Sequence, residues 1–263
     1  MSTAYVTLWL LTSAYAAPLG YYATEDTCRS AAGQLAVPPA AQILCVPSEV
    51  GQPPGAASVA AQAPATESPA SAAPTVSADS AKVSAAGVPF IGDEKAPVVM
   101  AYWYDYQCPF CKQNEETVLP RLIKDYVETG KVKVLFKDFA FLGPDSQTAG
   151  YAARAVWEVA PDKFYLWHKA VFDHQGQENT GWATKDKIIA LTRSIPGIDT
   201  DKVAQLMADH ATDYQKAIDA DGAEGAAMGV NGSPGAIIGT QLIVGAQPYE
   251  QLKAAIDAAL GQK

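Results

Sequence analysis

The chain has 263 residues and a mass of 27.7 kDa, with 49% hydrophobic and 18% charged residues. This length can bury a sizeable core, and the composition excludes wholesale disorder, collagen and coiled coil. The net charge is −9 and the pI is about 4.8, so counterion release would not drive binding to a phosphate backbone, and nucleic acid is not expected as a partner. No run of about 18 apolar residues is present, so no membrane-spanning helix is expected.

The first residues allow two interpretations. The apolar stretch 5–11 is followed by Ala14-Tyr15-Ala16, a sequence typical of a signal-peptide cleavage site. The stretch is short and no Lys or Arg precedes it, which argues against a signal. Apolar residues alternate from Val6 to Leu10, and this alternation predicts a β-strand instead. Cleavage of residues 1–16 is therefore left open.

Residues 1–50 are expected to form a small N-terminal module. Residues 24–35 predict a short helix with Thr24 as its N-cap, and residues 43–46 predict a strand. A Cys28–Cys45 disulfide would join the two and stabilise the module by about 3 kcal/mol, which a core this small requires. Two free, buried thiols are the alternative.

A linker is predicted over residues 51–87. It is rich in Ala, Pro, Ser and Gln and holds no large apolar side chain, so little burial is available to order it. Five prolines between 53 and 74 rule out a continuous helix. Residues 77–86 could be partly helical.

The composition of a globular domain starts at residue 88 and continues to 263. Residues 98–104 (VVMAYWY) form a continuous apolar run, as expected of a buried central strand. Residues 109–128 predict a helix that Pro120 would kink, and residues 131–136 predict a second strand. A helical crossover makes these two strands parallel.

A helical block is predicted at about 144–221. Its four expected helices cover 146–159, 161–172, 184–192 and 199–221. The spacing of its aromatic residues places most of them in the core, although one or two could line a groove for unfolded polypeptide. These residues are Trp157, Phe164, Trp167 and Phe172.

The pattern returns to strands after residue 234. Residues 235–238 and 241–244 flank Gly239-Thr240, a two-residue hairpin signal, and residues 249–260 predict a closing helix. The expected order is therefore β–α–β, a helical block, and β–β–α.

The remaining two cysteines form a Cys108-Pro-Phe-Cys111 motif where the first buried strand ends. Pro109 is suited to the first position of a helix, so Cys108 would lie at the helix N-cap, where free N–H groups and the helix dipole favour a thiolate. Cys111 lies one turn later on the same face, and we expect it to be the more buried, resolving thiol.

Two other uses of the motif compete with this interpretation. A zinc site needs four ligands, no second CxxC is present, and the three histidines show no ligand spacing. A purely structural disulfide is also possible. A redox-active pair is favoured over both, because CxxC beside a β–α–β pattern is typical of thiol–disulfide exchange.

The chain resembles the DsbA-like thiol–disulfide oxidoreductases, which have a thioredoxin fold with a helical insertion. The resemblance lies in Tyr104-Asp-Tyr-Gln-Cys-Pro-Phe-Cys-Lys-Gln-Asn-Glu-Glu116, in Gly229-Val-Asn-Gly-Ser-Pro234 and in Gly245-Ala-Gln-Pro-Tyr-Glu-Gln-Leu252. It covers about residue 87 to the end.

By this resemblance, Cys108 attacks or is attacked, and Cys111 resolves the mixed disulfide. Ser233-Pro234 matches the family's cis-proline loop, whose backbone faces an extended substrate strand; an ordinary trans turn is the alternative. The family more often has threonine before this proline and a larger residue where Gly235 stands. Both departures bear on redox potential and substrate choice.

Other residues could tune the site. Pro109 and Phe110 place no histidine beside the first cysteine, unlike the most oxidising family members, which implies a milder oxidant. Glu115 and Glu116 match family acids that either tune the thiolates or form a solvated helix face. Asp105 is either a proton-transfer acid or a strand-end residue.

The sequence therefore predicts an α/β, thioredoxin-like enzyme that exchanges disulfides with protein thiols, most simply by oxidising folding envelope proteins. Its location would be periplasmic or otherwise extracytoplasmic. Cysteine-containing polypeptides and a recycling redox partner are the expected partners, with no cofactor and no metal. A disulfide isomerase or reductase is the alternative within this chemistry. A peptide-binding or holdase module is the alternative from another class, and the N-terminal module could serve in docking.

Overall fold

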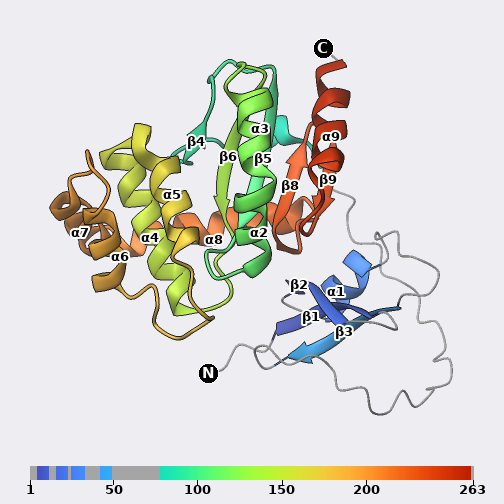
Figure 1. Ribbon diagram of the computed structural model, residues 1–263, viewed down its shortest axis with the longest axis horizontal. Coiled ribbons are helices and arrows are strands. Elements are labelled where there is room, and N and C mark those ends of the chain that lie inside the picture. The colour runs from blue at the N-terminus through green and yellow to red at the C-terminus, as the bar shows by residue number, and fades with distance from the viewer. Residues whose placement is uncertain (1–4, 12–15, 23–24, 33–41, 49–77, 262–263) are drawn as a thin grey trace.

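The computed structural model describes residues 5–11, 16–22, 25–32, 42–48 and 78–261 (Figure 1). Most of the predicted linker and part of the Ala14-Tyr15-Ala16 sequence lie outside these residues. The described strands form two sheets. The four-stranded sheet has the order β3 (Gln42–Ser48), β1 (Tyr5–Leu11), β2 (Ala16–Tyr22) and β7 (Gly232–Ser233). The five-stranded sheet has the order β4 (Phe90–Ile91), β6 (Val132–Asp138), β5 (Val98–Tyr104), β8 (Gly235–Ile238) and β9 (Gln241–Val244).

The five-stranded sheet is mixed. The predicted strand at 98–104 is β5 (Val98–Tyr104), and it runs parallel to β6 (Val132–Asp138). The predicted hairpin is β8 (Gly235–Ile238) and β9 (Gln241–Val244), with β8 antiparallel to β5. At the hairpin turn Gly239 has a φ of 57°, which glycine adopts without strain. The short strand β4 (Phe90–Ile91), which was not predicted, pairs with β6.

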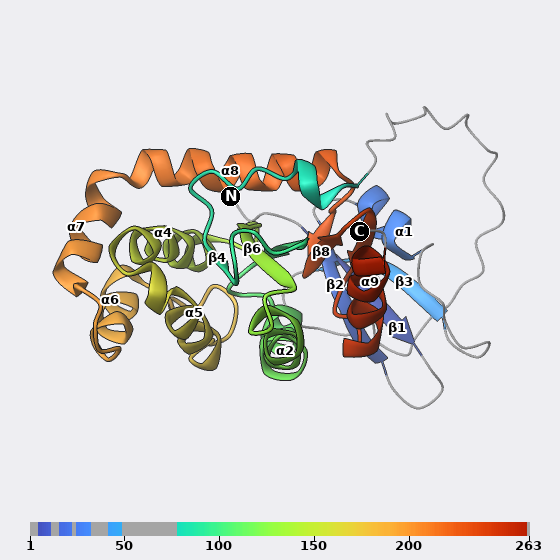
Figure 2. The same cartoon turned by 90° about the horizontal axis from the view of Figure 1, so that it is seen from above.

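Helices cover both faces of this sheet. Figure 2 shows α2 (Pro109–Thr117) and α9 (Tyr249–Gly261) on one side and α8 (Ala211–Ala227) on the other. The predicted helix at 109–128 is interrupted near Pro120, as expected. It continues after α2 as α3 (Leu119–Leu122) and the π-helical turn η2 (Ile123–Val127).

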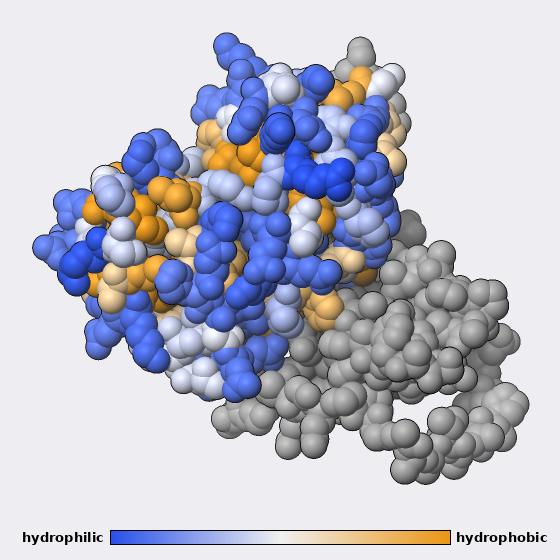
Figure 3. All heavy atoms as spheres, viewed as in Figure 1, coloured by the Kyte–Doolittle hydropathy of each residue, from blue (hydrophilic) through white to orange (hydrophobic). Residues whose placement is uncertain are grey.

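Alternate residues of β5 serve two hydrophobic cores, as the strand's period of two requires. Tyr102 and Tyr104 join the larger core with the helical block, whereas Ala101 and Trp103 join a smaller one. The Trp103 indole N–H donates to the Asp221 carbonyl at 2.8 Å. The surface of residues 78–261 in Figure 3 is mostly hydrophilic, with small, separated hydrophobic patches.

The helical block follows β6. Its helices are α4 (Pro144–Val159), the 3₁₀ turn η3 (Pro161–Lys163), α5 (Phe164–Asp173), α6 (Lys185–Arg193), α7 (Thr200–Asp209) and α8. The aromatic residues of the block are mainly core, as predicted: Phe164, Trp167 and Phe172 are fully buried.

The prediction of one helix over 199–221 was wrong. The chain breaks at His210, which ends α7 and starts α8, and α8 continues to Ala227. The break turns the chain from the side of α4 to the face of β6. Gly225 lets α8 approach closely, because a Cβ there would lie 2.6 Å from the Trp103 Nε1 atom.

A buried charge network fixes α4 and α8 to β6. The Lys137 Nζ atom lies 2.5 Å from Asp221 Oδ1 and 2.9 Å from Glu224 Oε2. The Arg154 guanidinium lies 2.8 Å from Asp138 Oδ2 and 2.5 Å from Asp221 Oδ2. Since an unpaired buried charge is costly, each of these groups needs its partners.

The N-terminal residues form a separate small sheet with one helix. Its elements are β1 (Tyr5–Leu11), β2 (Ala16–Tyr22), α1 (Glu25–Ala32) and β3 (Gln42–Ser48). The predicted Cys28–Cys45 disulfide is present and joins α1 to β3. The 5–11 stretch is a strand here, whereas β2 was not predicted. We call β1, β2, α1 and β3 the N-terminal module.

Residues 78–87 differ from the flexible linker expected there. They contain the 3₁₀ turn η1 (Ser80–Lys82), consistent with the partly helical alternative, and they pack onto the five-stranded sheet. Ser80 N–H donates to the Gly239 carbonyl at 2.8 Å, and Val83 is buried. Ser84 N–H donates to Glu224 at 2.8 Å, which ties the segment to α8.

Candidate active site

The Cys-Pro-Phe-Cys motif lies where β5 passes into α2, as predicted. Cys108 is the N-cap of α2, with extended backbone angles (φ −71°, ψ 118°), and Pro109 stands in the first turn. Cys108 N–H donates to the Asp105 carbonyl at 3.0 Å, which closes a tight turn after the strand. Phe110 is partly exposed and packs against the larger core. The cysteines are thus held between a buried strand and a helix terminus.

Both thiols are free and both are buried. The expectation that Cys111 would be more buried than Cys108 was wrong, because each has 0% exposure. Burial raises the pKa of the Cys111 thiol well above its ordinary value, and a hydrogen bond with Cys108 adds to the effect. Cys111 therefore stays protonated in the reduced protein.

The second half of the site comes from the strand β7 (Gly232–Ser233). The Ser233–Pro234 bond is cis, as expected, and the strand β8 that follows pairs with the end of β5. This pairing brings the Ser233 carbonyl to within 3.4 Å of the Cys108 Sγ atom, which donates to it. The Ser233 hydroxyl is buried and has no hydrogen-bond partner among the described residues.

Asp105 joins the motif to the loop that precedes α4. Its Oδ1 atom accepts from the Gln107 N–H at 2.7 Å and from the Ser146 hydroxyl at 2.6 Å. Its Oδ2 atom accepts from the N–H groups of Phe141 and Leu142, both at 3.0 Å. Burial raises the pKa of this carboxyl to about 6, against the opposing effect of these hydrogen bonds.

The two glutamates after the motif lie in different environments. Glu116 is exposed and forms an i,i+4 pair with Lys112 at 4.0 Å, so it belongs to a solvated helix face. Glu115 is buried, and its Oε1 atom lies 2.9 Å from the His168 Nε2 atom. Tyr165 donates a hydrogen bond to the other Glu115 oxygen at 3.3 Å.

Sequence reasoning missed two contributors from the helical block. His168 is fully buried and links Glu115 to Tyr106, whose hydroxyl lies 2.8 Å from His168 Nδ1. The Gln175 side chain donates to the carbonyl of Tyr106 at 2.7 Å and to that of Cys108 at 3.1 Å. No spacing in the sequence signals either residue, because each acts across more than fifty positions.

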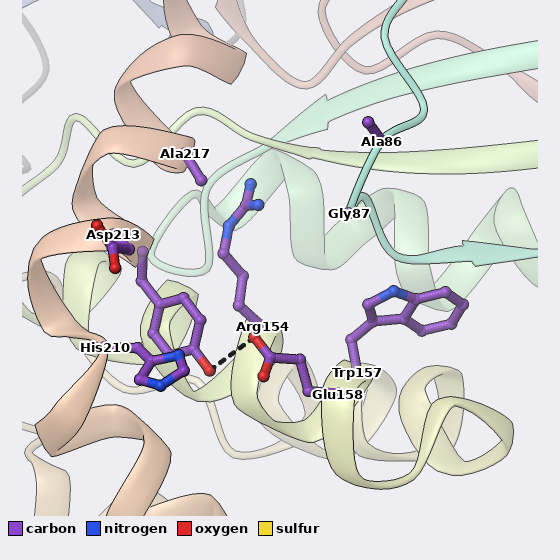
Figure 4. A pocket seen from close by; sticks show the side chains of 9 residues that line it. Ala86, Gly87, Arg154, Trp157, Glu158, His210, Asp213 and Ala217 are labelled. Carbon is purple, nitrogen blue, oxygen red and sulfur yellow. Dashed lines mark hydrogen bonds between the residues drawn. The ribbon is translucent and has the colours of Figure 1, made fainter.

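A hollow of about 380 Å³, which no cysteine lines, lies between the helical block and residues 86–87 (Figure 4). Arg154 and Trp157 of α4 line it, and the Tyr214 hydroxyl of α8 donates across it to Glu158 at 3.0 Å.

Among the residues that the structure describes, no group of three or more His, Cys, Asp or Glu could hold a metal ion. No helix of the described segments is long and apolar enough to span a membrane.

Several known proteins are similar in sequence to the part of the chain that holds this site. A family model described as thioredoxin matches residues 84–258. A probable disulfide bond formation protein D of Bacillus cereus is 28% identical over 172 residues, which are 65% of this chain and 77% of that protein. Disulfide bond formation protein D of Bacillus subtilis is 27% identical over 177 residues, which are 67% and 79% of the two chains.

The solved structures agree with this result. The crystal structure of oxidised BdbD from Bacillus subtilis aligns with a TM-score of 0.64 and 27% identity, over 71% of this chain and 98% of that one. The expected thioredoxin-like fold is therefore confirmed. The family match begins at residue 84, so the N-terminal module lies outside it.

Proposed function

The chain belongs to the thioredoxin family and is a DsbA-like thiol–disulfide oxidoreductase, and from this premise we propose that Cys108 and Cys111 are its redox pair. We further propose that it oxidises protein dithiols outside the cytoplasm. The observation that carries the assignment is the placement of Cys108 at the N-cap of α2, with Cys111 one turn later and the Ser233 carbonyl alongside.

The reaction starts from the Cys108–Cys111 disulfide. A substrate thiolate attacks the Cys108 sulfur, the Cys108–Cys111 bond breaks, and Cys111 leaves as a thiolate that takes up a proton. The second substrate thiol loses its proton and attacks the substrate sulfur of the mixed disulfide, which releases Cys108. The substrate has then lost two electrons and two protons, and the enzyme holds a dithiol.

The high pKa of Cys111 bears on the lifetime of the mixed disulfide. A protonated thiol is a poor nucleophile, so reduced Cys111 is slow to attack the mixed disulfide at Cys108. The mixed disulfide therefore persists long enough for the second substrate thiol to resolve it. A redox partner that accepts two electrons must then reoxidise the pair.

The N-terminal disulfide supports an extracytoplasmic location. Cys28 and Cys45 are joined in a protein whose other two cysteines are free, and structural disulfides persist mainly in oxidising compartments. In such a compartment the natural substrates are secreted or envelope proteins with unpaired cysteines.

The test is oxidation of a reduced, two-cysteine polypeptide, followed by mass spectrometry. Cys108→Ser should abolish transfer. The matched variant Cys111→Ser should abolish it too, because without Cys111 no Cys108–Cys111 disulfide forms to accept the two electrons of the substrate dithiol. Substrate oxidation by the Cys108→Ser protein would refute the assignment. Peptide binding without electron transfer in the unsubstituted chain would instead support the holdase alternative.

The reduction potential separates an oxidase from a reductase or isomerase. A value of about −120 mV, the level of a strong dithiol oxidase, would support the proposed direction, whereas one of about −270 mV would favour a reductase or an isomerase acting from the reduced state. Equilibration with glutathione, read by the mass of the alkylated Cys108–Cys111 peptide, gives this value.

A further inference from the structure

The N-terminal module binds to β7, the strand whose Ser233 carbonyl accepts a hydrogen bond from the Cys108 thiol. Its strand β2 pairs antiparallel with β7, with Tyr21 opposite Ser233 and Tyr22 opposite Gly232. The four-stranded sheet therefore ends on a strand from the C-terminal part of the chain. Figures 1 and 2 both show β1, β2 and β3 beside the end of the domain that holds β8, β9 and α9.

A second contact holds the module in place. The Asn231 side chain, one residue before β7, donates to the Thr27 carbonyl of α1 at 3.3 Å. Thr27 precedes Cys28, so the disulfide that joins α1 to β3 also braces this contact. The docked module thus meets the 231–233 segment through both a strand and a helix.

This docking coincides with closure of the site. Ser233 is 1% exposed, and its carbonyl accepts the hydrogen bond of Cys108, which is itself 0% exposed. An extended polypeptide that brings a cysteine to Cys108 needs a strand edge along which to pair, and β7 is the edge next to that sulfur. In this structure β2 already pairs with it.

We propose that β2 occupies the position of the substrate strand, so that the N-terminal module is a built-in gate over Cys108. Substrate polypeptide gains access when the module leaves β7. The pairing spans only two residues on each strand, so opening is a local event that leaves the five-stranded sheet intact. Because residues 49–77 connect the module to the rest of the chain, the open module competes with substrate at a high effective concentration.

The gate rests on the proposed exchange at Cys108, but its test does not need turnover. The full chain is reduced at the active site with Cys28–Cys45 left oxidised. The rate at which iodoacetamide alkylates Cys108 is then followed by peptide mass. Only the open state reacts if the gate exists, so the rate reports the open population.

The release variant is Tyr21→Pro/Tyr22→Pro. Successive amides of a strand point to opposite neighbours, so the pair of substitutions removes whichever donor faces β7. Alkylation of Cys108 should become at least about fivefold faster, the change that one backbone hydrogen bond makes in an equilibrium. The control is Gln42→Pro/Ser48→Pro, which places the same substitutions at the two ends of β3, the opposite edge of the sheet.

The outcomes separate the two proposals. A faster rate in the release variant alone supports the gate. Equal rates in the unsubstituted chain and the release variant would overturn it, and so would an equal acceleration in both proline variants. If alkylation responds as expected but no variant oxidises a dithiol polypeptide, the gate stands and the proposed function fails.

Discussion

Replacing Asp105 by asparagine separates the hydrogen bonds of this buried carboxyl from its charge. The asparagine retains one acceptor oxygen, which can serve the N–H groups of Phe141 and Leu142. The amide nitrogen then faces Ser146, whose hydroxyl can turn to accept, and the Gln107 N–H, which loses its acceptor. One orphaned buried donor costs about 1–3 kcal/mol of stability.

The charge of Asp105 destabilises the folded protein, because burial disfavours an ionised carboxylate, and it does so only at a pH where the carboxyl is ionised. Burial raises the pKa of Asp105 from 3.8 to about 6 in the folded protein, a difference that corresponds to about 3 kcal/mol at roughly 1.4 kcal/mol per pH unit. Because the pKa in the folded protein lies above that in the unfolded chain, the contribution of the neutral carboxyl to stability is complete below pH 3.8. This contribution is lost as the pH rises through about 6. The asparagine side chain does not titrate, so the variant escapes this loss.

We therefore expect the variant to be less stable than the unsubstituted chain at about pH 4, and the difference in their free energies of unfolding to shrink by about 2 kcal/mol by about pH 8. Urea unfolding of both proteins across this range, with the cysteines reduced, measures the difference. Asp138, whose pKa burial also raises to about 6, titrates in both proteins and cancels. Parallel stability curves would refute the reasoning, because they would mean that the hydrogen bonds outweigh burial at Asp105.

Three further outcomes follow from the packing. Gly225→Ala should destabilise the protein by about 1–3 kcal/mol, because its Cβ would clash with the buried Trp103 indole. Gly222→Ala on the same helix should instead stabilise it by about 0.5–1 kcal/mol, because its Cβ would lie 3.6 Å from the nearest atom, in Phe139. Thermal unfolding of the two variants compares these effects. Arg154→Met should cost about 3–5 kcal/mol in urea, because the buried Asp138 loses its cation and Asp221 keeps only Lys137, and a loss below about 1 kcal/mol would contradict the role of the network. Cys28→Ser/Cys45→Ser should destabilise the N-terminal module by about 3 kcal/mol, measured by hydrogen exchange in α1 and β3; unchanged protection would argue against the disulfide as its brace.

The first half of the site could be predicted from local sequence. The apolar run 98–104 ends at the motif, and Pro109 fixes the start of the helix, so the position of Cys108 depends only on neighbours in the chain. The hairpin at Gly239 is similarly local, since two residues decide its turn.

The remaining features depend on distant partners and left no local signal. The break at His210 has no glycine or proline, and apolar residues continue at helical spacing across it. His168 meets Glu115 across 53 positions. The strands β2 and β7 pair across more than two hundred residues, and Pro18 and Gly20 weaken the strand signal of β2.

The order of the cysteines along the chain bears on how the protein itself matures. Four cysteines allow three pairings, and here Cys28 is joined to its nearest neighbour in sequence, Cys45, while Cys108 and Cys111 lie three positions apart. Only 17 positions separate Cys28 from Cys45, whereas the Ser233 carbonyl that contacts Cys108 lies 125 positions downstream of it. During vectorial export or synthesis the first pair can close before the second emerges. A protein that handles the disulfides of others can thus acquire its own without any reshuffling.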